Sequence, residues 1–172
     1  MARLAEKLID EGKNKKAKEV LDLAVQKMPL DYFGYYSLVV PMVDTYYRLG
    51  DIKSAQDLAA QIAEKYRDEM EYFSSLKASE QYFLGEEIIT QAERYRTLME
   101  AILVNKDKIQ LNKSLIQFLE AIKPFINLYG EYEFYTSLSM FVEGFYITGN
   151  KAKAQNLIED IFQQYEGRFA MI

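Results

Sequence analysis

Apolar side chains recur along this chain with the spacing of one face of an α-helix. One apolar stripe precedes each of three glycines, and a second, with the spacing i, i+4, i+7, follows each of them. The preceding stripes are Met1, Leu4, Ala5 and Leu8; Val39, Met42, Val43 and Tyr46; and Leu138, Phe141, Val142 and Phe145. The following stripes are Ala17, Leu21 and Ala24; Ala55, Ala59 and Ile62; and Ala154, Ile158 and Ile161. Each glycine is therefore predicted to separate two amphipathic helices.

The three glycines share a local motif, because an alanine follows each of them five positions later. The pairs are Gly12 and Ala17, Gly50 and Ala55, and Gly149 and Ala154. Glycine adopts the left-handed conformation that closes a helix, and an alanine on the next helix lets the two backbones approach closely. The motif predicts three helical hairpins.

A further hairpin is predicted between the second and third of these motifs. Helical apolar spacing covers about residues 80–104 and about residues 109–128, and the polar residues 105–107 make the turn between them. Segment 68–79 is predicted to be the longest connection.

Two prolines raise questions about individual helices, because proline lacks a backbone donor and crowds the preceding turn. Pro41 predicts a helix that begins near Val40 or is kinked there, and Pro124 raises the same question in the sixth helix. The elements together predict an all-α, single domain over residues 1–172: a right-handed α-solenoid of about four antiparallel helix pairs. The pairs are predicted over about 1–29, 35–68, 80–129 and 131–167.

Composition excludes several kinds of chemistry. The 172 residues include no Cys, His or Trp, which excludes thiol nucleophiles, histidine bases, His/Cys zinc sites and disulfides. The net charge of -5, without a basic stripe, argues against a nucleic-acid partner. No apolar run approaches the ~20 residues of a membrane helix, so we expect no direct membrane insertion by this segment.

Carboxylate pairs are the remaining candidates for catalysis or metal binding. Glu6 and Asp10 stand at i, i+4, and Asp68, Glu69 and Glu71 gather in the predicted connection. An oxygen-only pair without a third ligand makes a poor metal site, and solvated surface is the simpler interpretation. We therefore expect no catalytic residues, no metal and no cofactor in this chain.

The repeated unit resembles the tetratricopeptide repeat, a helix pair with conserved small and aromatic positions and a closing proline. The first unit, which closes at Met28 and Pro29, matches that pattern best. The spacings between the glycines differ from the 34 residues of the family, and no first helix carries its Leu-Gly pair. The resemblance implies a protein-interaction module rather than an enzyme.

A second resemblance covers mainly the first half of the chain. It is carried by Arg3–Glu6, Glu11–Gly12, Lys16–Ala17, Val20–Asp22, Met28–Pro29, Asp31–Phe33, Pro41 and Asp44–Gly50. These residues resemble the soluble C-terminal region of bacterial multi-spanning proteins whose membrane part is like protein O-mannosyltransferases, which are GT-C-type glycosyltransferases. The resemblance implies an accessory module on the periplasmic side of a membrane-anchored parent, whose catalytic residues lie outside this chain.

The beginning of the chain fits that expectation. Leu4, Leu8 and Ile9 open it without a polar helix that would cap a terminal repeat, so we expect a piece of a longer protein. A free-standing cytoplasmic scaffold is the alternative.

In the repeat family the first helix of each pair lines a groove that takes an extended peptide. In the register above, the residues that would face it are Glu6, Asp10, Asp44, Tyr47, Arg48, Glu143 and Tyr146, with Ile9, Val40, Ser139 and Ile147 beside them. Such an acidic, tyrosine-lined groove favours a polar or basic segment of a protein or peptide partner. The alternative is that the carboxylates are solvated and that the two tyrosines pack between neighbouring pairs.

A tyrosine-rich echo suggests a glycan acceptor as a further partner. Its residues are Tyr32, Phe33, Tyr35 and Tyr36 in one segment and Tyr132, Phe134 and Tyr135 in the other. Aromatic rings stack on sugars, although core packing at the start of a helix pair is the preferred interpretation. The sequence thus predicts a non-catalytic module that binds a protein or holds an acceptor, with a purely structural or oligomerisation domain as the alternative.

Overall fold

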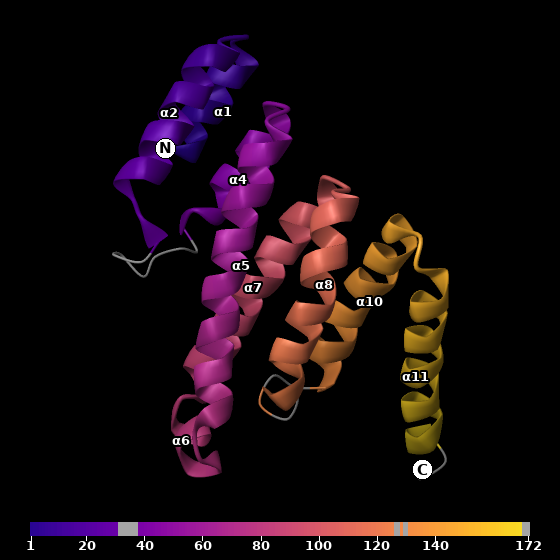
Figure 1. Cartoon of the computed structure of the whole chain (residues 1–172). Helices are drawn as coiled ribbons and strands as arrows, with labels where there is room; N and C mark the ends of the chain where they lie inside the picture. Colours follow the sequence, from indigo (N-terminus) through magenta and orange to yellow (C-terminus); the bar gives the residue numbers. More distant parts are fainter. Residues whose placement is uncertain (31–37, 126–127, 129–130, 170–172) are drawn as a thin grey trace.

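The computed structural model describes residues 1–30, 38–125, 128 and 131–169; for helix residues 131–138, 160, 161 and 163–169 it describes the backbone alone. Within the described residues every regular element is a helix (Figure 1). The helices are α1 (Ala2–Asp10), α2 (Asn14–Lys27), α4 (Val40–Arg48), α5 (Ile52–Ser75), α6 (Ala78–Phe83), α7 (Gly85–Val104), α8 (Lys108–Ile122), a 3-10 helix (Lys123–Phe125), α10 (Glu131–Thr148) and α11 (Lys151–Phe169). The prediction of an all-α chain is confirmed.

Eight of these helices form four successive antiparallel pairs, α1–α2, α4–α5, α7–α8 and α10–α11 (Figure 1). Each first helix packs against the first helix of the next pair: α1 against α4, α4 against α7, and α7 against α10. Each second helix packs against the first helix that follows it: α2 against α4, α5 against α7, and α8 against α10. The same two kinds of helix contact therefore relate all successive pairs, including α7–α8, which lacks the glycine motif.

The short turns inside the four pairs lie at the same end of the molecule and share one geometry (Figure 1). Gly12, Gly50 and Gly149 have φ of 72°, 76° and 82°, as the glycine motif predicts. At the remaining turn, between α7 and α8, Lys106 occupies the position of the glycine, with φ of 53°.

Matching hydrogen bonds close each turn. The N–H of Gly50 donates to the carbonyl of Tyr47 at 2.9 Å and that of Asp51 to Tyr46 at 3.0 Å. In the α7–α8 pair the N–H of Lys106 donates to the carbonyl of Leu103 at 2.9 Å, and the N–H of Asp107 donates to the carbonyl of Ile102 at 3.3 Å. This pattern is the Schellman motif, which satisfies the last carbonyls of a helix. The α7–α8 hairpin therefore closes with the same motif as the three hairpins that have a glycine.

The core changes in character along the array. Ala17, Ala55 and Ala154 are fully buried, which confirms the predicted close approach of the paired helices. The centre instead contains a row of four buried aromatic rings from α5, α7, α8 and α10: Tyr66, Tyr95, Phe118 and Phe141. Neighbouring ring centroids in this row lie 5.4, 4.8 and 5.3 Å apart.

Two predicted boundaries are wrong. Residues 68–79 are not a long connection, because α5 continues to Ser75 and α6 begins at Ala78. No helix breaker interrupts that stretch, and Tyr66, Met70 and Phe73 continue the buried stripe at helical spacing. The helix predicted over about 109–128 ends at Ile122, and Lys123–Phe125 continue as a 3-10 helix, because Pro124 has no N–H to donate to the carbonyl four residues before it.

The prediction for Pro41 is confirmed. Helix α4 begins at Val40, which places Pro41 in the first turn, where its missing N–H costs no helical hydrogen bond. The tyrosine-rich segment 31–37 and the side chains of 131–138 lie outside the described residues, so the sugar-stacking hypothesis stays a prediction. Among the described helices, none has both the length and the apolar character needed to cross a bilayer.

Candidate interaction site along the first helices

The predicted groove residues lie on three first helices, α1, α4 and α10. Glu6 is half-buried and Asp10 exposed on α1; Arg48 is exposed on α4; and Glu143 and Tyr146 are exposed on α10. The structure brings the residues of α1 and α4 together, whereas α7 lies between α4 and α10. The two residues on α10 are therefore separate from the rest of the predicted set.

Asp10 and Arg48 form an ion pair between the first two helix pairs. The Arg48 Nη2 atom lies 3.0 Å from Asp10 Oδ1, and both side chains are solvent-exposed. Exposed pairs of this kind contribute ~1 kcal/mol or less. The pair links α1 to α4 but contributes little to the stability.

Tyr47 is buried between α4 and the turn that joins α7 to α8. Its hydroxyl donates to Asp107 Oδ2 at 2.9 Å, and Gln56 Nε2 donates to the same oxygen at 2.7 Å. Asp107 Oδ1 accepts the backbone N–H groups of Ile109 and Gln110, so this carboxylate also caps α8. The Tyr47 hydroxyl is thus engaged inside the fold, as the packing alternative expects.

The electrostatics of this cluster follow from its burial and its donors. Burial alone would raise the pKa of Asp107, but the hydrogen bonds from Gln110, Gln56, Tyr47 and Ile109 outweigh it and lower that pKa. Burial, together with the hydrogen bond to Asp107, raises the pKa of Tyr47. At neutral pH the cluster therefore holds an ionised Asp107 beside a neutral Tyr47.

Asp44 lies one turn before Tyr47, at the edge of a hollow between α4, α5 and α7. Its Oδ1 accepts a hydrogen bond from Asn105 Nδ2 at 2.9 Å. The hollow has a volume of about 270 Å³ and is lined by Val40, Pro41, Asp44, Tyr66, Arg94, Thr97 and Ala101. We call it the α4–α7 hollow. Its apolar lining with one carboxylate and one guanidinium can accept an apolar side chain and hydrogen-bond to the polar groups beside it.

The α7 side of this hollow was missed by reasoning from the sequence. Arg94, Thr97 and Ala101 are spaced i, i+3, i+7, which is the spacing of one helix face. Asn105 continues the same face four residues later. The sequence does not mark the register of this face, because the turn after α7 has Lys106 where the other three turns have a glycine.

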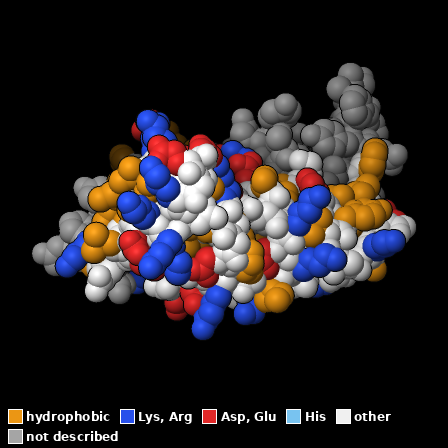
Figure 2. Space-filling view, turned by 90° about the horizontal axis from the view of Figure 1, so that it is seen from above, with side chains coloured by type: hydrophobic (Ala, Val, Ile, Leu, Met, Phe, Trp, Pro, Cys, Tyr) orange, Lys and Arg blue, Asp and Glu red, His pale blue; other side chains and the backbone are white. Residues whose placement is uncertain are grey.

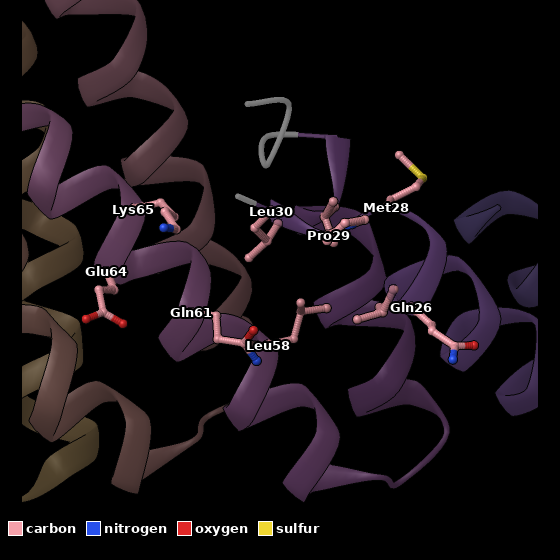
Figure 3. Close-up of a pocket in the computed structure, with 10 residues that line it drawn as sticks. Gln26, Met28, Pro29, Leu30, Leu58, Gln61, Glu64 and Lys65 are labelled. Atoms are coloured by element: carbon pink, nitrogen blue, oxygen red, sulfur yellow. The ribbon is translucent and has the colours of Figure 1, made fainter. Parts of the chain in front are cut away.

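A second cavity lies where α2, α4 and α5 meet (Figure 3). It has a volume of about 480 Å³; Met28, Pro29, Leu30 and Leu58 form its apolar part, and Gln26, Gln61, Glu64 and Lys65 lie around it. Residues 31–37, which follow Leu30 directly, are outside the described part of the chain.

The charged surface is mixed in sign. Seen from the end where the four turns lie, Lys and Arg side chains alternate with Asp and Glu (Figure 2). Among the residues that the structure describes, no three Asp or Glu side chains gather as a metal site would require.

Compared with protein-family models, with curated proteins and with solved structures, the chain matches none.

Proposed function

We propose that this chain is a non-catalytic interaction module, built as a right-handed, tetratricopeptide-like solenoid, which binds an extended segment of a protein partner along its first helices. The observation that carries the proposal is the α4–α7 hollow. It opens between two successive first helices, where the repeat family places its groove.

The repetition of the fold supports the solenoid part of the proposal. The same contacts relate every pair to the next, and every pair closes with the same left-handed turn. A repeated contact between neighbours is the property that defines solenoids, in which each unit contacts only those beside it. Helices α5 and α8 add a further contact between successive second helices.

The composition of the hollow supports a peptide as the occupant. An extended peptide presents N–H and C=O groups beside each side chain; Asp44 accepts hydrogen bonds and Arg94 donates them. The volume of about 270 Å³ suits one apolar side chain. On the neighbouring first helix, α1, Glu6 adds negative charge, which favours basic residues in the flanks of the bound segment, whereas Asp10 is paired with Arg48.

The proposal is tested by selecting peptides from a random-peptide display library on the whole chain. Their affinity is then measured by fluorescence anisotropy for the wild type and for Ala101→Leu, which fills the hollow. We expect Ala101→Leu to weaken binding about tenfold or more, which corresponds to ~1.4 kcal/mol. Arg94→Ala should weaken binding less, because it removes only a donor.

The matched control is Val104→Ala, an exposed position on the same helix outside the hollow. It should leave affinity unchanged, and thermal unfolding of each variant checks that the fold is intact. Equal binding by Ala101→Leu and the wild type would refute the assignment of the hollow. Failure to enrich any peptide would favour the purely structural alternative.

We also propose that this module is an accessory domain of a membrane glycosyltransferase and lies on the periplasmic side of the membrane. The support is the resemblance carried by the first half of the sequence. Several apolar runs of ~20 residues encoded upstream of Met1 would agree with this setting. A coding frame without them would leave the free-standing scaffold.

A further inference from the structure

A further hollow lies on α7, toward the end of the helix that α6 joins. It has a volume of about 470 Å³ and is lined by Phe83, Leu84, Glu86, Glu87, Thr90, Gln91 and Arg94. We call it the α6–α7 hollow. Arg94 also lines the α4–α7 hollow, so the two hollows adjoin at this side chain.

The two hollows lie along one face of α7. The lining residues of this face follow one another at spacings of three and four positions: Glu87, Thr90, Arg94, Thr97 and Ala101. A helix rises about 1.5 Å per residue, so Glu87 and Thr97 are about 15 Å apart along its axis. An extended peptide advances about 3.3 Å per residue, so about four or five residues span this distance. A segment held in the α4–α7 hollow can therefore reach the α6–α7 hollow.

An exposed aromatic pair stands at the α6 end of this hollow. Phe83 is 85% exposed and Tyr82 is 77% exposed, and their rings meet edge to face with centroids 6.3 Å apart. Helix α6, at the end of the molecule opposite to the four turns (Figure 1), is tied to α5 by Gln81. The Nε2 atom of Gln81 donates to the carbonyls of Phe73 and Leu76 at 3.0 and 3.1 Å. The backbone that carries the rings is thus held in place before a partner binds, which lowers the cost of binding.

The polar part of the α6–α7 hollow is mainly acidic. Glu86 and Glu87 are exposed side chains of its lining. Burial raises the pKa of Glu69 on α5, and the negative charge of Glu87 raises it further, whereas the positive charge of Arg94 lowers it. A third carboxylate therefore lies near Glu87, and the three carboxylates outnumber the one guanidinium. The hollow favours a cation beside an exposed aromatic ring.

We propose that an Arg or Lys side chain of the bound segment lies in the α6–α7 hollow, about four or five residues along the segment from the apolar residue in the α4–α7 hollow. Its place on that segment rests on the peptide binding proposed above. The cation pairs with Glu87 and packs on the ring of Phe83, which is a cation–π interaction. The partner is therefore recognised by two anchors, one apolar and one basic, at a fixed separation.

The first test measures the peptides selected on the whole chain, together with analogues in which glutamine replaces the basic residue. Fluorescence anisotropy should show binding of the basic peptide weakened about three- to fivefold by Glu87→Gln and by Phe83→Ala, and about tenfold by both changes together. The glutamine analogue should bind the wild type and these variants equally, which isolates the pairwise contact.

Matched controls remove a similar group outside both hollows. Glu120→Gln removes an exposed carboxylate of α8, and Tyr72→Ala removes an exposed ring of α5. Neither should change the affinity, and thermal unfolding checks that each variant is folded. Peptides that are weakened by Ala101→Leu but unaffected by Glu87→Gln and Phe83→Ala would overturn the cation subsite and leave the proposed function intact.

A second test needs no peptide that enters the α4–α7 hollow. The backbone amide chemical shifts of the whole chain are followed by NMR during titration with N-acetyl-arginine amide, and N-acetyl-glutamine amide is the neutral control. Saturable changes are expected in residues 83–94 with the arginine compound, reduced in Glu87→Gln and retained in Glu120→Gln. These changes, with no peptide enriched by selection, would refute the proposed function and keep the cation subsite. Equal shifts with both compounds, or none in this region, would overturn the subsite itself.

Discussion

The first helix pair and the centre of the array are packed with side chains of different size. The buried side chains of α1 and α2 are Ala5, Ala17, Leu21 and Ala24. In the centre, Tyr66, Tyr95, Phe118 and Phe141 form a continuous row across four helices. The first pair is held by close backbone approach, and the centre by large buried rings.

This difference predicts a gradient of stability along the chain. An aromatic side chain buries ~150–250 Å², and each buried Å² of apolar surface contributes ~25 cal/mol, so the centre gains far more than the alanine-lined pair. The first pair adds polar ties to the second: Lys18 to Asp51, and the Tyr46 hydroxyl to Asp22 at 2.8 Å. We expect α1 and α2 to open before α7 and α8.

The largest effect is expected from Phe118→Ala, which breaks the aromatic row in its middle. Phe118 is fully buried and contacts both Tyr95 and Phe141. The cavity should lower the free energy of unfolding by ~3–5 kcal/mol, measured by urea denaturation. Leu23→Ala, at an exposed position of α2, is the control and should change it by less than ~0.5 kcal/mol. A small loss at Phe118 would mean that the row is not the stable centre.

The next effect is expected from Asp107→Asn, at the polar tie between α4 and the α7–α8 turn. The amide presents a donor toward Tyr47 and Gln56, which leaves buried donors without an acceptor and costs ~1–3 kcal/mol. The folded-state pKa of Asp107 is lowered, so its contribution is present above the unfolded pKa of ~3.9 and is lost as pH falls through the folded value. As the pH falls from about 5 to about 3, the free energy of unfolding should therefore decrease more for the wild type than for the variant. Denaturant unfolding at each pH measures this difference. Parallel curves would contradict this role.

Ala17→Leu tests the close approach in the first pair. Ala17 is fully buried between α1 and α2, and the larger side chain should overpack that interface at a cost of ~1–3 kcal/mol. Hydrogen exchange should accelerate in α1 and α2 while α7 and α8 keep their protection. Lys16→Leu introduces the same side chain at the neighbouring exposed position and should change neither region. Accelerated exchange throughout the chain would show that the first pair does not open separately.

The smallest effects are expected at the turns, where Gly12 and Lys106 provide a matched comparison. A Cβ at Gly12 would meet no atom within 4 Å, so Gly12→Ala measures only the left-handed strain, ~1–2 kcal/mol. Lys106→Gly should relieve similar strain but adds freedom to the unfolded chain, for a net gain of less than ~1 kcal/mol. Thermal unfolding of both variants checks the opposite signs. A destabilised Lys106→Gly would mean that the lysine side chain contributes contacts of its own.

Much of the helical architecture could be predicted from the sequence, because its signals are local. The three glycines, the alanine after each and the stripes around them place six helices, and Pro41 places the start of α4. The end of α8 differs from the prediction because the apolar pattern continues past Pro124, whereas the missing N–H of that proline ends the α-helical hydrogen bonding at Ile122. The length of α5 depends on tertiary packing, because Tyr66, Met70 and Phe73 are buried against other helices and the helix continues to Ser75.

The candidate site could be predicted only in part, for a physical reason. Asp44 lies at the α4–α7 hollow, as its register suggests. The hydroxyl of Tyr47, however, donates a hydrogen bond inside the fold to Asp107, sixty positions later in the chain. No local pattern in α4 contains that carboxylate. The α7 side of the hollow could not be predicted from local patterns either, because Lys106 stands in place of the glycine that marks the end of the first helix in the other pairs.

By itself, the sequence determined the local features: the left-handed turns at glycine, the close approach of helices at alanine, and the apolar stripe of each helix. Each of these depends on a few residues that are close in the chain. Only the tertiary structure decided which of these faces are covered. Leu4 and Met42 occupy the same position of the repeat, yet one is exposed and the other buried. The difference arises because burial depends on whether a neighbouring pair lies against that face, and this is a property of the packed array rather than of the residue.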